Sequence, residues 1–217
     1  MPQLFINWEH NLSRKHLKNG CKTLGLRSFL ANYNQALLHR LGGQYGPYRA
    51  KGYLMILIRK AVEGDAQAIY DLRSRAILEE CSGFYSAEQL SLWTKGGVSE
   101  SLITDIVNSF YVSESDGQVI GSGKLTIETG MLDAIFVEPE FFGKGAARLM
   151  VAFLESLALE KGLSSLKLES TLNAASFYRR CGFIGDEIST YHSPRGISLD
   201  CVPMQKTLET KEKGSTS

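Results

Sequence analysis

Residues that could bind a phosphate-bearing ligand lie between positions 132 and 154 of this 217-residue chain. An apolar strand predicted over 132–137 leads through Pro139 and the turn Gly143-Lys144-Gly145 into an amphipathic helix. A helix N-terminus presents free backbone N–H groups and the positive end of the helix dipole, so it attracts anions. Lys144 and Arg148 would add positive charge nearby. The order of these residues therefore predicts a phosphate site at the turn.

The glycine turn departs from two common nucleotide-binding motifs. A P-loop needs a glycine and a hydroxyl residue where this chain has Glu138 and Gly145. A dinucleotide fingerprint needs a third glycine where this chain has Arg148. We exclude both motifs, while a turn whose glycines serve only the backbone stays open.

A second constellation follows the next predicted strand, 166–170, and the two segments together resemble the GNAT superfamily of acetyl-CoA-dependent N-acyltransferases. In that family a strand ends in V-x-P before [Q/R]-x-x-G-x-[G/A], and a later segment reads A-x-x-[LF]-Y-x-x-x-G-F. The matching residues are Val137-Glu138-Pro139, Phe142-Gly143-Lys144-Gly145-Ala146-Ala147 and Ala174-Ala175-Ser176-Phe177-Tyr178-Arg179-Arg180-Cys181-Gly182-Phe183. Phe142 departs from the family's Gln or Arg, and we expect this to weaken cofactor binding modestly.

The resemblance implies that acetyl-CoA, the co-substrate, lies where two parallel strands, 132–137 and 166–170, splay apart. Backbone groups of Ile135 and Val137 would pair with the pantetheine arm, and amides of the turn would hold the pyrophosphate. Asn173 is expected to bond the cofactor or to cap the helix predicted over 173–180. The full set of expected cofactor-binding residues is Ile135, Phe136, Val137, Phe142, Gly143, Lys144, Gly145, Ala146, Ala147, Arg148, Asn173 and Tyr178. No metal is implied.

The chemistry implied is direct attack of a primary amine on the thioester in a ternary complex. Tyr178 stands at the family's general-acid position, and its alternative is a core tyrosine with a satisfied hydroxyl. Asp133 and Glu169 are candidate bases, and each reads equally well as a solvated strand-end carboxylate. Glu79, Glu80 and Tyr85, between the first two predicted helices, are candidates to line the acceptor pocket.

The surrounding periodicity predicts an α/β (α+β) fold: a mixed, mostly antiparallel, twisted sheet of about six to seven strands with helices on both faces. The GNAT-like domain is predicted over residues 55–208. Residues 1–54 are predicted to be a weakly structured basic extension, and 209–217 a polar tail.

Charge and composition favour some classes of binding partner over others. The net charge is +1, but residues 1–54 carry +7 and the remainder −6, which favours a cationic small-molecule or peptide amine and argues against nucleic acid. The four cysteines lack metal-site spacing, and no apolar run approaches the ~20 residues of a membrane span. With no secretory signal evident, we expect a cytoplasmic protein. A homodimer stays open, as do a toxin-type enzyme acting on aminoacyl-tRNA and a non-catalytic acyl-CoA-binding module.

Overall fold

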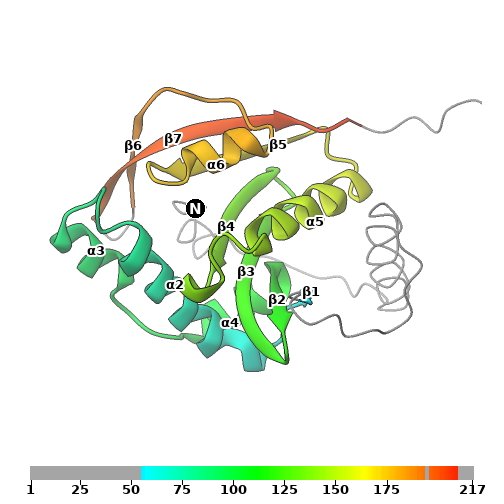
Figure 1. Ribbon diagram of the computed structural model, residues 1–217, viewed down its shortest axis with the longest axis horizontal. Coiled ribbons are helices and arrows are strands. Elements are labelled where there is room, and N and C mark those ends of the chain that lie inside the picture. Colours follow the sequence, from blue (N-terminus) through cyan, green and yellow to red (C-terminus); the bar gives the residue numbers. More distant parts are fainter. Residues whose placement is uncertain (1–54, 194–195, 210–217) are drawn as a thin grey trace, which may run out of the picture.

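A computed structural model describes residues 55–193 and 196–209 (Figure 1). The predicted basic extension over 1–54 and the polar tail from residue 210 onward lie outside the described residues. The same holds for residues 194–195, in the turn between the last two predicted strands.

The sheet is mixed and mostly antiparallel, as predicted, and has seven strands in the order β1-β2-β3-β4-β5-β7-β6. β4 and β5 are parallel, and the other neighbouring pairs are antiparallel. The strands are β1 (Leu57–Lys60), β2 (Phe110–Ser115), β3 (Gln118–Thr126), β4 (Met131–Val137), β5 (Ser165–Thr171), β6 (Ser189–His192) and β7 (Ser198–Thr207).

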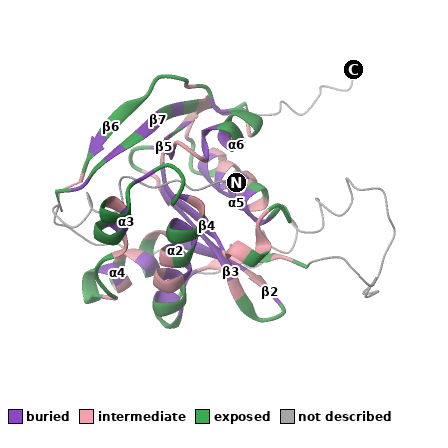
Figure 2. Cartoon of the chain, turned by 60° about the vertical axis from the view of Figure 1, so that its left-hand side comes forward, coloured by how far each residue is buried: buried purple, intermediate pink, exposed green. Residues whose placement is uncertain are grey.

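Helices cover both faces of the sheet and form two cores (Figure 2). Side chains alternate along β4: Ile135 and Val137 face the first core, whereas Ala134 and Phe136 face the second. The first core includes α5 (Ala146–Glu160) and α6 (Ala175–Arg180). The second includes α2 (Ala66–Glu80), α3 (Ala87–Thr94) and α4 (Glu100–Ser109).

The sequence holds two local signals for helix starts, the capping-box pattern Ser86-Ala87-Glu88-Gln89 and Asp65, and the structure follows only the first. The capping box of α3 is present: Ser86 Oγ accepts the Gln89 N–H at 3.2 Å, and Gln89 Oε1 accepts the Ser86 N–H at 2.9 Å. Asp65, by contrast, makes no side-chain cap to α2. Its carboxylate instead accepts two hydrogen bonds from Arg59, at 2.6 and 2.9 Å, because this bidentate ion pair is the stronger interaction.

The sequence pattern predicts a strand over 183–191 and no helix between residues 97 and 109, and the structure differs at both places. α4 was not predicted, although Ser99 caps it and Leu102 and Ile106 are buried one turn apart. The strand predicted over 183–191 is reduced to one isolated bridge, Ile184 to Gln205, and to β6. Pro203 of β7 lies between these two pairings and has no N–H to donate, so the ladder is interrupted there.

The parallel strands β4 and β5 separate almost where they begin. One register pair joins them, Met131 with Lys167, and the Lys167 N–H donates to the Gly130 carbonyl at 2.9 Å. Toward their carboxyl ends β4 keeps only β3 and β5 keeps only β7 (Figure 1). The predicted splay between two parallel strands is therefore confirmed.

Candidate cofactor and active site

A cavity of about 190 Å³ lies at the carboxyl end of β4, against the N-terminus of α5. Its lining includes most of the predicted turn and two residues of α6. The lining residues are Val137, Phe141, Phe142, Gly143, Gly145, Ala146, Ala147, Arg148, Phe177 and Arg180. Phe177 and Arg180 were not expected to bind the cofactor. They reach the cavity because the fold packs α6 beside α5.

The backbone of the turn needs its glycines and leaves donors free. Gly143 and Gly145 have φ angles of +72° and +90°, in the left-handed region that favours glycine. The helix ladder of α5 starts with the Leu149 N–H, which donates to the Gly145 carbonyl at 3.0 Å. The N–H groups of residues 146–148 therefore have no acceptor within the helix, as a phosphate site at a helix N-terminus requires.

Phe142 supports the turn through packing. It is partly buried and contacts both hydrophobic cores, so it anchors the turn where the family places a polar side chain. Lys144, which was expected to face the phosphates, does not line the cavity. Its Nζ lies 5.0 Å from the centre of the Phe141 ring.

An ion pair that sequence reasoning missed fixes the start of the turn. Arg75 of α2 donates to both carboxylate oxygens of Glu138, at 2.5 and 3.1 Å. The Glu138 N–H donates to the Ile120 carbonyl at 2.9 Å. The first residue after β4 is thus held both by the sheet and by α2. Nothing in the local sequence around Glu138 signals a partner 63 residues away.

Alternate residues of β4 direct their backbone N–H and C=O groups toward the gap between β4 and β5. Because the Glu138 N–H points to β3, alternation also directs the backbone groups of Phe136 and Ala134 to β3. The N–H and C=O groups of Ile135 and Val137 therefore face β5, where no ladder partner remains. Their pairing with a pantetheine arm stays a prediction, for which the gap leaves the backbone groups free. Phe136 faces β3 with its backbone and the second core with its side chain.

Tyr178 is fully buried beside this region. Its ring packs edge-on against Phe177 and Phe183, with centroids 5.0 and 5.8 Å away. Its hydroxyl finds no hydrogen-bond partner among the described residues. Burial raises the pKa of Tyr178 well above its ordinary value, so the phenol stays protonated. An orphaned buried hydroxyl is the kind of group that a bound ligand satisfies.

Asn173 is partly satisfied. Its Oδ1 accepts a hydrogen bond from Cys81 Sγ at 3.7 Å, while its buried Nδ2 has no partner among the described residues. It does not cap the following helix, which begins at Ala175 with Ala174 at the cap position. The predicted capping role is therefore wrong, and the free amide group remains available to a ligand.

The two candidate bases lie near one another. Asp133 is the extra residue of a β-bulge, because Lys124 pairs with Ala134 and Leu125 pairs with Leu132. It is 6% exposed and accepts a hydrogen bond from the Thr126 hydroxyl. Burial raises the pKa of Asp133 to about 6, and the negative charge of Glu169 adds to this rise. A solvated strand-end carboxylate is thus the wrong description for Asp133.

A buried cation, Lys124, counters the rise in the pKa of Asp133. Lys124 is 0% exposed, and its Nζ donates to Asp105 Oδ2 of α4 at 2.9 Å. Its charge lowers the pKa of Asp133, whereas Asp105 raises it. This group of Lys124, Asp105, Asp133 and Glu169 joins β3, α4, β4 and β5 at the narrow end of the gap.

The three residues that were predicted to line an acceptor pocket differ from one another in their burial and in their partners. The Tyr85 hydroxyl donates to the Asp200 carbonyl at 2.7 Å and accepts the Leu172 N–H at 3.1 Å, so it ties the loop between α2 and α3 to the sheet. Glu79 is exposed and Glu80 half-buried, and burial raises the pKa of Glu80.

Comparison with known proteins agrees with this geometry. The model of the acetyltransferase (GNAT) domain family matches residues 107–184, which include the gap, the glycine turn and Tyr178. This part of the chain is therefore similar to the GNAT acetyltransferase domain, as the motifs in the sequence predicted. The described residues hold no helix long and apolar enough to span a membrane. They also hold no group of three or more His, Cys, Asp or Glu arranged for a metal ion.

Relatives and solved structures extend the likeness to a longer part of the chain than residues 107–184. The uncharacterized N-acetyltransferase CT2212 of Chlorobaculum tepidum is 28% identical over 137 residues, which cover 58% of this chain and 86% of that protein. A GCN5-related N-acetyltransferase from Rhodopseudomonas palustris has a TM-score of 0.66 at 21% identity and covers 74% of this chain and 99% of its own. YncA from Salmonella typhimurium, a putative acetyltransferase solved with its cofactor acetyl-CoA, has a TM-score of 0.55 at 21% identity, covering 75% and 99%.

The charge group around Asp133 yields a prediction that needs no substrate. Replacing Lys124 with Met should raise the pKa of Asp133 above about 6, because the cation no longer favours the carboxylate. Replacing Asp105 with Asn should lower it. Carbon-detected NMR titration of the Asp133 carboxyl in each variant measures both shifts. Lys144→Met, in the turn beyond the carboxyl end of β4, is the control, and shifts of equal size in the control would contradict the assignment.

Proposed function

We propose that this GNAT domain transfers the acetyl group of acetyl-CoA to a primary amine. The observation that carries the proposal is the gap between β4 and β5, where backbone groups of Ile135 and Val137 lack a strand partner and lead to the cavity at the turn. An extended ligand with amide groups and phosphates suits this combination of free backbone, helix N-terminus and arginines. The N-acetyltransferase relative and the YncA structure with acetyl-CoA support the same reading.

The residues present fit such a ligand. Ile135 and Val137 would pair with its amide-bearing arm, and the N–H groups of residues 146–148 would hold phosphate oxygens at the cavity. Asn173 Nδ2 and the Tyr178 hydroxyl are buried donors without partners in the described part of the chain. When bound, acetyl-CoA supplies an activated thioester that an amine can attack without a covalent enzyme intermediate.

Two proton transfers fall to this chain. Asp133 or Glu169 would accept a proton from the amine, directly or through a water, since both carboxyls lie at the narrow end of the gap. Tyr178 would donate its proton to the departing sulfur, because its phenol is protonated at neutral pH and its hydroxyl has no partner in the described part of the chain. The buried Asp133 and the half-buried Glu169 also favour an acceptor that arrives as a cation, such as a lysine-like or polyamine group.

The direct test mixes the full chain with acetyl-CoA and a panel of primary amines and follows the release of free thiol. Calorimetry with acetyl-CoA alone separates the outcomes. Saturable binding with thiol release supports the proposal. Saturable binding without turnover of any amine would favour a non-catalytic acyl-CoA-binding module, and absence of binding would contradict both readings.

Tyr178→Phe should lower kcat by roughly 100-fold or more, the scale of a general-acid contribution, with little change in the dissociation constant for acetyl-CoA. Tyr70→Phe is the matched control, because the Tyr70 hydroxyl donates to the Thr94 carbonyl away from the gap. Steady-state rates with a good acceptor amine measure the effect. A variant as fast as the control would remove Tyr178 from the chemistry.

The rate should depend on pH through Asp133. A base must be ionised to accept a proton, so kcat/KM should fall as the pH drops through about 6, where Asp133 gains a proton. Asp133→Asn and Glu169→Gln decide between the two candidates: the variant that abolishes this acid limb identifies the base. Profiles with the same limb in both variants would exclude both carboxyls.

A further inference from the structure

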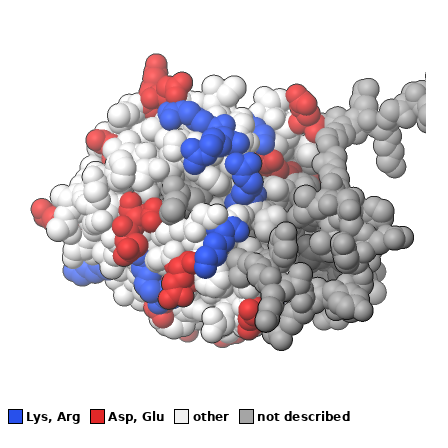
Figure 3. Space-filling view, in the orientation of Figure 1, with Lys and Arg blue, Asp and Glu red and all other residues white. Residues whose placement is uncertain are grey.

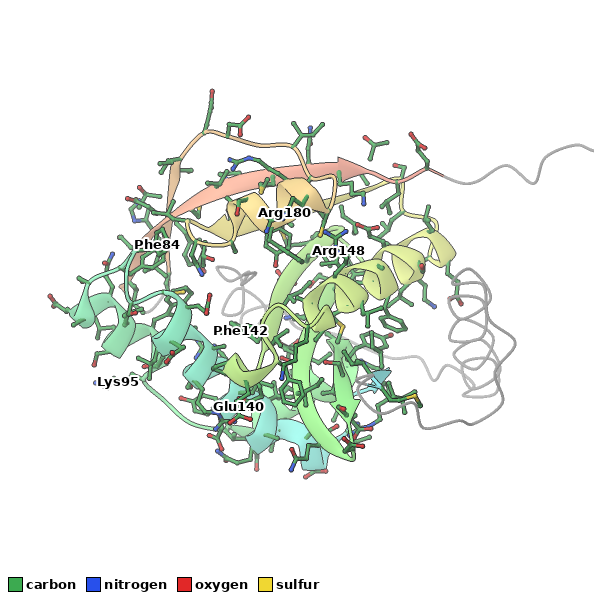
Figure 4. All side chains as sticks on the ribbon, in the orientation of Figure 1. Phe84, Lys95, Glu140, Phe142, Arg148 and Arg180 are labelled. Atoms are coloured by element: carbon green, nitrogen blue, oxygen red, sulfur yellow. The ribbon has the colours of Figure 1, made fainter. Side chains whose placement is uncertain are left out.

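The loop between α2 and α3 reaches the strands on the far side of the gap. Residues 81–86 of this loop carry no charge, and in Figure 3 the Lys and Arg side chains of this face gather elsewhere, near α6 and the start of α5. Phe84, labelled in Figure 4, marks the loop where it approaches β6 and β7. The loop is therefore joined to the sheet by uncharged groups, and the Tyr85 hydroxyl makes two of these contacts.

The Tyr85 hydroxyl stands in the place of one rung between β5 and β7. The register of the two strands pairs Thr171 with Cys201. The next pair would be Leu172 with Asp200, whose N–H and C=O would meet directly in a regular antiparallel ladder. Instead, the Leu172 N–H donates to the Tyr85 oxygen at 3.1 Å, and the Tyr85 hydroxyl donates to the Asp200 carbonyl at 2.7 Å. A side chain from the loop after α2 thus ends the pairing of β5 at Thr171.

The same loop also holds the next residue along the chain. The Cys81 thiol donates to Asn173 Oδ1 at 3.7 Å. Burial raises the pKa of Cys81 to about 12, so the thiol keeps the proton that it donates. Two consecutive residues, Leu172 and Asn173, are thus held by side chains of one loop.

The turn held in this way leads directly into the helix that carries Tyr178. The Ala174 N–H donates to the Thr171 carbonyl at 3.0 Å, and the Ala174 carbonyl accepts the Tyr178 N–H at 3.2 Å. Only residues 172–174 separate the end of β5 from the start of α6. A displacement of Leu172 would therefore be passed on to Tyr178, whose hydroxyl has no partner of its own in the described part of the chain.

We propose that Tyr85 is a positioning residue for the transfer reaction: its hydroxyl, inserted between β5 and β7, sets the course of the turn 172–174 and thereby places Tyr178 at the gap. The proposal rests on the proposed function, since Tyr85 acts through the general acid assigned there. This role differs from the acceptor contact that the sequence predicted for Tyr85.

The experiment compares Tyr85→Phe with Tyr70→Phe in the full chain, using acetyl-CoA and one good acceptor amine. Each variant removes a hydroxyl that donates to a backbone carbonyl, and the Tyr70 hydroxyl bonds Thr94, away from the turn. Tyr85→Phe should lower kcat roughly tenfold or more, since a displacement of about 1 Å at a reacting group can cost ~100-fold. Tyr70→Phe should leave kcat unchanged. Equal rates in the two variants would overturn the proposal.

A double variant separates positioning from a general loss of stability. Tyr85→Phe should slow the wild type but add little to Tyr178→Phe, because a positioning residue has no effect once the group that it positions is removed. A loss by the same factor in both backgrounds would show that Tyr85 does not act through Tyr178, and would contradict the proposal.

NMR tests the inserted hydroxyl in the free wild-type chain, without turnover. A direct backbone hydrogen bond gives a scalar coupling between the amide nitrogen of the donor and the carbonyl carbon of the acceptor. This coupling should be present between Lys167 and Gly130, whose direct bond is 2.9 Å long, and absent between Leu172 and Asp200. A coupling between Leu172 and Asp200 would show that the strands pair directly there, and would overturn the insertion.

Failure of the proposed function gives a different result. A wild-type chain that neither binds CoA nor releases thiol from acetyl-CoA would refute acetyl transfer, and the role of Tyr85 in it. A wild-type chain that uses acetyl-CoA, with Tyr85→Phe as active as Tyr70→Phe, would refute the positioning role alone.

Discussion

The single pairing between β4 and β5 is the constraint on which the site depends. After Met131 and Lys167 the two strands go to different neighbours, and the backbone of Ile135 and Val137 is left facing a gap. An unpaired buried backbone group costs about 1–3 kcal/mol. The sheet cannot recover this cost by itself, because β5 diverges from β4 beyond the pair Met131–Lys167. Under the proposed function, the donor completes the sheet at this position.

The same gap separates opposite charges along β4. The glycine turn, Arg148 and Arg180 line the cavity at the carboxyl end of the strand. Asp133 lies nearer its start, with Lys124 and Asp105 beside it. Asp133 is the third of the seven residues of β4, so about 13 Å of strand separates it from Val137 at the carboxyl end. A ligand with phosphates at one end and an amine acceptor approaching the other would be oriented by this arrangement before any chemistry begins.

Local patterns in the sequence were sufficient to predict the strand, the turn and the helix that build the site. The apolar run before Pro139, the glycines of the turn and the periodicity of α5 each act within a few residues, and the predicted strand, turn and helix match the structure. The reduced β6 was predicted as a longer strand because its interruption comes from Pro203, on the neighbouring strand. α4 was overlooked although its cap and two buried positions were visible in the sequence.

The residues missed at the site are those placed by the tertiary structure. Arg180 reaches the cavity through the packing of α6 beside α5, and Arg75 meets Glu138 across 63 positions of sequence. Burial of Lys124 depends on α4, which had not been predicted. Local spacing carries no information about such contacts. Tyr178 and Asp133 were found through the resemblance, but the burial that shifts their pKa values is a property of the folded chain.

Hydrogen exchange at single amides of β4, measured by NMR with and without acetyl-CoA, tests the central claim most directly. We expect the Ile135 and Val137 N–H groups to exchange readily in the free protein and to become protected when acetyl-CoA binds. The Phe136 N–H, which faces β3, should be protected in both states. Unchanged exchange at Ile135 and Val137 in the presence of saturating acetyl-CoA would contradict the claim that the donor completes the sheet.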